Sequence, residues 1–156
     1  TDILELLRDP ERTALNLVTL PEEMPVNETL MLRDEIRQKL EMPLGWVIAN
    51  GVYSPLFSDS ERDWIEAAHP YTDRAGEAPV PGMVNAAAFR TQRVDMQREY
   101  LDRLRDEVDQ PMLQIPFFFT NRLTFPQIER VAERFEKAIE DDEQPPVQPA
   151  LQASAE

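Results

Sequence analysis

Short apolar runs alternate with longer amphipathic segments along the chain. The first run spans residues 14–20 and is closed by Pro21, and the second spans residues 44–49 and stops at Asn50. Short, mostly apolar runs of this kind are typical of buried strands in a parallel sheet. A third run, Met112 to Pro116, has the same character. We therefore predict three strands, with Asn50 at the carboxyl end of the second.

Apolar residues at helical spacing predict helices between and after these strands. Asn27 is expected to cap a helix that ends near Leu40, and a capping box at residues 58–61 opens a short helix that ends near Ala68. Further helices are predicted from about Val84 to Val108 and from Thr124 onward. The side chains expected to be buried include Thr29, Leu32, Ile36, Leu40, Trp64, Ile65, Ile128, Val131, Ala132, Phe135 and Ile139.

The alternation of strand and helix predicts an α/β fold, with three strands and flanking helices as part of a doubly wound, mainly parallel sheet. Three strands bury only part of such a sheet and leave an edge strand open, which native proteins avoid. We therefore expect residues 1–140 to be part of a domain whose other half lies upstream or in a second chain. Residues 141–156 are acidic and rich in Pro and Gln, and are expected to form a disordered tail.

The charge and composition of the chain argue against several classes of partner and site. The net charge of −14 argues against nucleic acid and anionic membrane as partners. With no Cys and one His, the chain has neither a disulfide framework nor a Cys- or His-based metal site. The lack of Cys fits a reducing cytoplasm, which is the location we expect. No apolar stretch reaches membrane-spanning length, so we expect no membrane insertion. The chain starts Thr1-Asp2-Ile3, and we expect it to begin inside a longer gene product.

A series of segments resembles the carboxyl-terminal half of the arsenite-pump ATPases. These segments are Leu17-Val18-Thr19-Leu20-Pro21-Glu22, Val26-Asn27-Glu28-Thr29, Ile48-Ala49-Asn50, Met96-Gln97-Arg98-Glu99-Tyr100-Leu101 and Leu113-Gln114-Ile115-Pro116. This family of P-loop NTPases is also called the anion-transporting ATPases, and it includes the factor that targets tail-anchored membrane proteins. The resemblance covers most of residues 10–139, and its specificity comes from the order and spacing of the series.

The resemblance implies an adenine site. In this family the Asn that matches Asn50 contacts adenine, and the loop after the residue that matches Pro116 wraps the base. An Asn amide has a donor and an acceptor that can pair with adenine, and the backbone of Phe117 and Phe118 could complete the pocket. The implied cofactor is ATP or ADP, with Mg²⁺ held only by the missing amino-terminal half. The simpler alternatives are that Asn50 caps a turn and that the Phe side chains are core.

The departures from the family are equally informative. No Gly-x-x-x-x-Gly-Lys-Ser/Thr phosphate loop is present. We therefore expect no catalytic residue in this chain and no ATP hydrolysis without the missing half. The zinc-binding Cys pair of the targeting factors is replaced by Ala87 and Arg90, which argues against a zinc-linked dimer.

Two functions remain open. The first is the adenine side of a cytoplasmic ATPase of the anion-transporting type, completed by an amino-terminal half or companion chain and acting as a homodimer or paralogue heterodimer. The second is a non-enzymatic module, derived from such an ATPase, that binds a partner protein and no nucleotide. A phosphate loop upstream in the same reading frame or in an adjacent one would favour the first.

Overall fold

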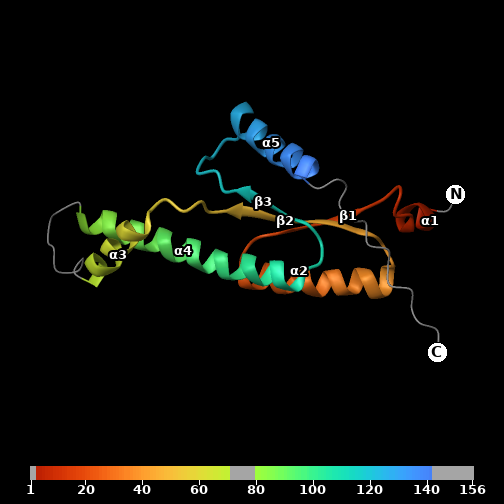
Figure 1. Ribbon diagram of the computed structural model, residues 1–156, viewed down its shortest axis with the longest axis horizontal. Helices are drawn as coiled ribbons and strands as arrows, with labels where there is room; N and C mark the ends of the chain where they lie inside the picture. The colour runs from red at the N-terminus through yellow and green to blue at the C-terminus, as the bar shows by residue number, and fades with distance from the viewer. Residues whose placement is uncertain (1–2, 71–79, 142–156) are drawn as a thin grey trace.

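The computed structural model describes residues 3–70 and 80–141 and contains one parallel sheet. Its strands are β1 (Leu15–Thr19), β2 (Leu44–Val52) and β3 (Met112–Pro116), in the order β1-β2-β3. Figure 1 shows α2 and α4 along one face of this sheet and α5 on the other. The predicted α/β class, the three strands and their parallel arrangement are confirmed.

The core lies between the sheet and the two helices α2 (Glu23–Glu35) and α4 (Val80–Glu107). Side chains from β1 and β2 meet those of the helices there, because alternate residues of each strand point toward the helices. The buried members are Leu17, Val26, Leu30, Ile36, Leu44, Val47, Leu104 and Val108. Burial of these side chains is the main stabilising contribution that holds the helices on this face.

Helix α2 begins five residues earlier than predicted. Its N-cap is Glu22, and Asn27 lies inside the helix, where its Oδ1 accepts a hydrogen bond of 2.7 Å from Arg103. The prediction placed Pro25 before the helix. In the structure Pro25 lies in the first turn, where a missing N–H costs no helical hydrogen bond.

The predicted buried stripe of this helix is also partly wrong. Beyond Glu35 the chain makes a π-helical turn, η1 (Ile36–Leu40), that ends at Glu41 in the left-handed conformation. A π turn holds more residues than an α turn, so apolar spacing no longer follows one face. Ile36 is buried, whereas Leu40, within the π turn, is exposed. Leu32 is also exposed, although it lies in the regular part of α2 before this turn.

Strand β2 is longer than predicted and is not interrupted at Asn50. It continues to Val52, and its pairing with β3 runs from Val47 opposite Met112 to Val52 opposite Pro116. The register shifts between Ala49 and Val52. Asn50 and Gly51 therefore lie within an irregular end of the strand, and we attribute the early predicted end to their polar and small side chains.

Helices α3 (Asp59–Ala68) and α4 pack against each other beyond the carboxyl end of β2. The predicted capping pair is confirmed, since Glu61 accepts hydrogen bonds from the backbone N–H and the hydroxyl of Ser58 at 2.8 and 2.7 Å. Ile65 is buried as predicted. The prediction that Trp64 is buried is wrong, because 60% of this residue is exposed.

The second face of the sheet is only partly covered. Helix α5 (Phe125–Asp141) contacts β3, and Nη1 of Arg134 donates to the carbonyl of Gln114 at 3.1 Å. The expected core face of α5 is only partly buried. Val131 and Phe135 are half-buried, whereas Ala132 and Ile139 are exposed and Ile128 is 57% exposed. On β1, Val18 faces the same uncovered side and is 64% exposed. Within the described chain, this apolar surface has nothing packed over it.

The short helix α1 (Ile3–Arg8) lies at the start of the described chain and precedes β1. Much of the irregular stretch after His69 and the tail from residue 142 lie outside the described residues. No helix in the described part of the chain combines the length and the apolar character needed to cross a membrane.

Candidate functional site

Asn50 lies where the family resemblance places the adenine contact, near the carboxyl end of the central strand. Its side chain is exposed and lines a groove of about 350 Å³ between the end of β1 and helix α2. The other residues that line this groove are Val18, Thr19, Leu20, Pro25, Glu28, Thr29 and Leu32. A mostly apolar groove with a few polar groups can hold a planar base and orient it by hydrogen bonds.

Gly51 connects this groove to the loop that follows β3. Its φ of +74° lies in the left-handed region that favours glycine. A Cβ at this position would lie 3.6 Å from Leu20 and 3.7 Å from Phe117. In addition, the N–H of Phe117 donates to the carbonyl of Val52 at 2.9 Å. The loop after β3 therefore lies against the end of β2, next to Asn50 in the sequence.

The residues after β3 do not all occupy the expected places. Pro116 is buried at the end of β3, whereas Phe117 is exposed. Phe118 is half-buried, with the guanidinium of Arg130 5.7 Å from its ring centroid. Neither Phe117 nor Phe118 lines the Asn50 groove. The alternative that these rings are core is wrong for Phe117 and Phe119, both of which are exposed.

A buried amide holds the end of β2 to helix α4. Gln97 is 3% exposed, and its Oε1 accepts a 2.7 Å hydrogen bond from the N–H of Tyr53. Its Nε2 donates to the carbonyl of Gly51 at 3.1 Å. Gln97 thus satisfies two backbone groups of an irregular strand end that would otherwise be left unpaired at a cost of roughly 1–3 kcal/mol each.

Three aromatic rings and an arginine cluster beside this strand end. Tyr53, Phe117 and Phe119 have ring centroids 4.7 to 5.4 Å apart. The guanidinium carbon of Arg90 lies 4.4 Å from the Tyr53 centroid and 4.5 Å from that of Phe119. Stacking of this kind contributes about 0.5–2 kcal/mol. The stacking of Arg90 on Phe119 holds the loop after β3 against helix α4.

Arg90 is incompletely paired in this cluster. Its Nη2 donates to the carbonyl of Ser54 at 2.8 Å, but its Nε and Nη1 are buried and have no partner among the described residues. Nearby, Arg93 forms a 3.0 Å ion pair with Glu22 at the start of α2. The cluster therefore combines cationic donors and aromatic faces at the carboxyl edge of the sheet.

The sequence-based prediction missed Tyr53, Arg90 and Gln97. The signal was present in the long helix, where Arg90, Arg93 and Gln97 follow one another at intervals of three and four residues on one side. In the sequence, Gln97 interrupts the apolar stripe of this helix. A polar residue within an apolar stripe indicates a buried hydrogen-bonding group. The partners of Gln97, however, lie 44 and 46 residues away in the sequence, and the periodicity of a helix gives no information on contacts at that separation.

No group of three or more metal-ligating side chains comes together within residues 3–70 and 80–141. The pKa of Glu61 is lowered by its hydrogen bonds from Ser58, and the pKa of Arg62 is raised by its hydrogen bond to Asp95. Both groups lie on α3, away from the Asn50 groove, and their shifts arise from structural contacts.

Comparison with known proteins links part of the chain to one group. A 52-residue segment is 44% identical to an arsenical pump-driving ATPase of Escherichia coli, which corresponds to 33% of this chain and 9% of that protein. A match of 83 residues to the arsenical pump-driving ATPase of Acidiphilium multivorum is 37% identical. It spans 47% of this chain and 14% of the relative.

A second Escherichia coli arsenical pump-driving ATPase is 36% identical over 83 residues, with the same coverage of 47% and 14%. The chain matches no protein-family model. The matches thus span no more than about one seventh of the length of these relatives. Together with the parallel α/β sheet, they show that the chain is related to the arsenite-pump, or anion-transporting, ATPase family.

Proposed function

We propose that this chain forms the adenine side of the nucleotide site in an ATPase of the anion-transporting type. Asn50 binds the edge of the base in the groove between β1 and α2, and the loop after Pro116, with the backbone of Phe117 and Phe118, encloses it. The phosphates and Mg²⁺ are held by a phosphate loop outside this chain, either in an amino-terminal half or in a companion chain.

The observation that carries this proposal is the exposed amide of Asn50 in a groove at the carboxyl end of the central parallel strand. In open α/β sheets, ligands bind at this edge. The groove has apolar walls from Val18, Leu20 and Leu32, and polar groups from Thr19, Glu28 and Asn50. Relatives named arsenical pump-driving ATPases make a nucleotide the best-supported ligand.

The experiment is an Asn50→Ala substitution in the complete ATPase, with ATP affinity measured by calorimetry. Loss of the amide removes up to two hydrogen bonds, worth about 0.5–1.5 kcal/mol each, so we expect about a tenfold weaker affinity. Asn85→Ala is the matched control, because Asn85 is exposed on α4 and does not line the groove. Unchanged affinity in the Asn50 variant would contradict the proposed base contact.

A second candidate function is a non-enzymatic module that binds a partner protein and no nucleotide. It is favoured by the exposed apolar side chains of α5, among them Ile128 and Ile139. The same surface is expected in a half-domain, so surface exposure does not separate the two. Measuring ATP binding by the complete protein separates the two functions, because the non-enzymatic module would bind no ATP even at millimolar concentration.

A further inference from the structure

Arg90 contacts two segments that border the candidate nucleotide site. Tyr53 follows β2, three residues after Asn50, and Phe119 lies in the loop after β3, three residues after Pro116. The guanidinium carbon of Arg90 lies over both rings, 4.4 Å from the Tyr53 centroid and 4.5 Å from the Phe119 centroid. The two ring centroids are themselves 5.4 Å apart. One side chain of α4 therefore contacts both parts of the site.

The same side of α4 also holds the end of β2 by hydrogen bonds. Arg90 and Gln97 are seven residues apart, which is about two helical turns, so both side chains lie on one side of the helix. Gln97 forms hydrogen bonds of 2.7 and 3.1 Å with backbone groups of residues 51–53. Nη2 of Arg90 donates to the carbonyl of Ser54 at 2.8 Å. Two side chains of α4 therefore fix the strand end that carries Asn50.

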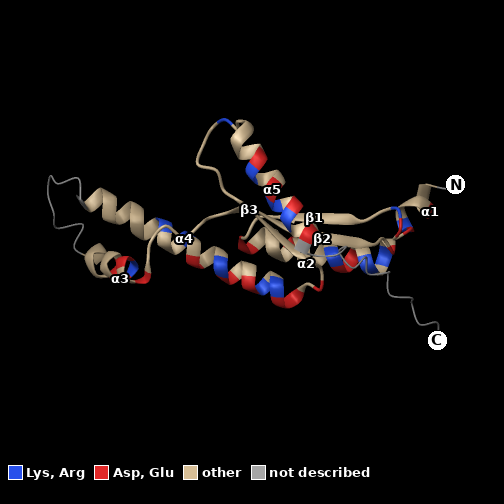
Figure 2. Ribbon diagram, turned by 45° about the horizontal axis from the view of Figure 1, so that its top comes forward, with Lys and Arg blue, Asp and Glu red and all other residues tan. Residues whose placement is uncertain are grey.

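The contact of Arg90 with the loop is made by stacking. Its Nε and Nη1 are buried and have no hydrogen-bond partner among the described residues. Arg90 is also the first charged residue of α4, because residues 80–89 contain none (Figure 2). The turns before it therefore offer no acid for an ion pair. A flat guanidinium is stabilised over aromatic rings, and Lys carries the same charge without the flat group.

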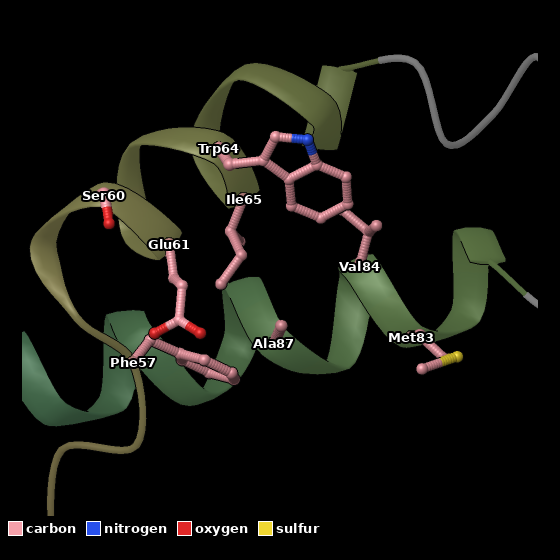
Figure 3. A pocket seen from close by; sticks show the side chains of 8 residues that line it. All are labelled: Phe57, Ser60, Glu61, Trp64, Ile65, Met83, Val84 and Ala87. Atoms are coloured by element: carbon pink, nitrogen blue, oxygen red, sulfur yellow. The ribbon is translucent and has the colours of Figure 1, made fainter.

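Helix α3 holds in place the part of α4 that carries Arg90. Figure 3 shows Ile65 of α3 directed between the two helices toward Ala87, which lies one turn before Arg90. Ile65 is buried there. Beyond Arg90, Asp95 accepts hydrogen bonds of 2.6 and 2.7 Å from Arg62 of α3. Contacts on both sides therefore fix the backbone from which the Arg90 side chain extends.

The loop that contains Phe119 spans residues 117–124, between β3 and α5 (Figure 1). Its start is bonded to the sheet, where the N–H of Phe117 donates to the carbonyl of Val52 at 2.9 Å. Phe119, two residues further on, is 69% exposed, so burial contributes little to the position of its ring. The contact with Arg90 therefore ties this part of the loop to α4.

We propose that Arg90 is a positioning residue for the nucleotide base. It acts through the loop after Pro116 and not on the nucleotide, because its guanidinium is buried against the two rings and the Ser54 carbonyl. By holding the loop against the strand end of Asn50, it lowers the entropic cost of ordering the loop when the base binds. This inference rests on the proposed nucleotide site, since it requires the loop to enclose the base.

The first test measures the nucleotide affinity of the complete ATPase by calorimetry. Arg90→Ala should weaken ATP binding about two- to thirtyfold, the range that cation–π contacts span. Arg90→Lys should weaken it similarly, because Lys keeps the charge and loses the flat group. ADP should lose the same factor as ATP, since the loop encloses the base. The control is Arg105→Ala, which removes an equal charge from an exposed position on α4 and should leave the affinity unchanged.

The second test follows the loop in the same protein without nucleotide. Arg122 is exposed within the loop, so the rate at which trypsin cleaves after it measures how often the loop opens. Arg90→Ala and Phe119→Ala should each raise this rate at least about twofold. The double variant should be little faster than either single variant, because both substitutions remove the same contact. Arg105→Ala should leave the rate unchanged.

Any of three results would overturn the proposal. One is full ATP affinity in Arg90→Lys with a loss in Arg90→Ala, because charge would then be the cause. Another is an unchanged cleavage rate at Arg122 in Arg90→Ala. The third is weaker ATP binding in Asn50→Ala but not in Arg90→Ala, which leaves the nucleotide site standing. If neither variant binds ATP more weakly, the nucleotide site itself fails, and cleavage at Arg122 still tests the contact between Arg90 and the loop.

Discussion

Gly51 lies between Asn50 and the loop after β3, the two parts of the candidate nucleotide site. Its positive φ turns the end of β2, its carbonyl accepts from Gln97, and the space beside it is bordered by Leu20 and Phe117. The steric space is adequate for a Cβ, since both neighbours would be at ordinary contact distances. The backbone conformation is therefore the factor that requires glycine.

We predict that Gly51→Ala destabilises the chain by about 1–2 kcal/mol, the cost of a left-handed conformation for a residue with a Cβ. Gly82→Ala is the control, because Gly82 is helical and an added Cβ would meet nothing within 4 Å. This second substitution should leave stability unchanged or raise it by up to about 1 kcal/mol. Urea denaturation midpoints compare the two, and equal midpoints would refute the conformational argument.

At this scale, the sequence was sufficient to select Asn50 as a candidate but not to define its surroundings. An apolar run followed by Asn indicates a polar group at the end of a strand. The neighbours of that group depend on α2, whose Thr29 and Leu32 line the same groove. The stacking of Arg90 between Tyr53 and Phe119 joins residues 37 and 29 positions apart, and local patterns carry no information on such contacts.

Among the elements, short apolar runs predicted the strands well and helix faces less well. All three strands were located because a parallel sheet covered by helices requires apolar residues. Helix α2 was misplaced because Pro25 is acceptable in a first turn, and the predicted burial of Leu40 is wrong because η1 changes the angular spacing. The stripe of α5 was predicted to be buried, but only Val131 and Phe135 are half-buried, and Ile128, Ala132 and Ile139 are exposed.

The start of α3 should depend on pH. The hydroxyl of Ser58, and next its N–H, lower the pKa of Glu61 below its ordinary value of 4.5. The unfolded chain then binds more protons than the folded chain between the two pKa values. The stabilisation is therefore present above about pH 4.5 and is lost as the pH falls through the folded-state pKa.

We predict that Ser58→Ala raises the pKa of Glu61 most of the way to its ordinary value, since the hydroxyl is the larger of the two contributions. The measurement is an NMR titration of the Glu61 side-chain carboxyl carbon. Ser60→Ala is the control, because the Ser60 hydroxyl contacts that of Ser58 and not the Glu61 carboxylate. An unchanged Glu61 titration in the Ser58 variant would disprove the assigned cause.

Helix α5 provides a test of the open face. We predict that Ile128→Ser combined with Ile139→Ser changes the free energy of unfolding by less than about 1 kcal/mol, because little apolar area at these residues is buried. Binding of a hydrophobic dye should decrease in the same variant. Leu104→Ala, at a fully buried residue, should instead cost about 2–5 kcal/mol. A comparable loss in both variants would mean that the α5 face is covered.

At the scale of the whole molecule, the exposed apolar face and the lack of a phosphate loop in the sequence both agree with the proposal that another segment completes the nucleotide site. The sheet has three strands, and one of its faces has little cover beyond α5. The fold class was predictable because it follows from the order of strands and helices. The residues that would cover Val18 and Ile128 could not be predicted, because the described chain contains no segment that packs there.

We predict that the purified 156-residue chain hydrolyses no ATP above the background rate in the presence of Mg²⁺. Phosphoryl transfer requires groups that hold the phosphates and the metal, and the sequence has no phosphate loop. The measurement is phosphate release, with heat-denatured protein as the control. Turnover that co-purifies with the chain through two chromatographic steps would refute the view that this is only the adenine side of the site.

The strand register also has a kinetic consequence. Leu17 pairs with Val47, 30 residues away, whereas Ile48 pairs with Leu113, 65 residues away. Closing the longer loop costs only about 0.7 kcal/mol more in chain entropy, so the topology imposes little equilibrium penalty. The order of events is affected more, because nearby contacts form sooner. We expect β1, α2 and β2 to assemble first, and β3 to join once α4 has docked on this unit.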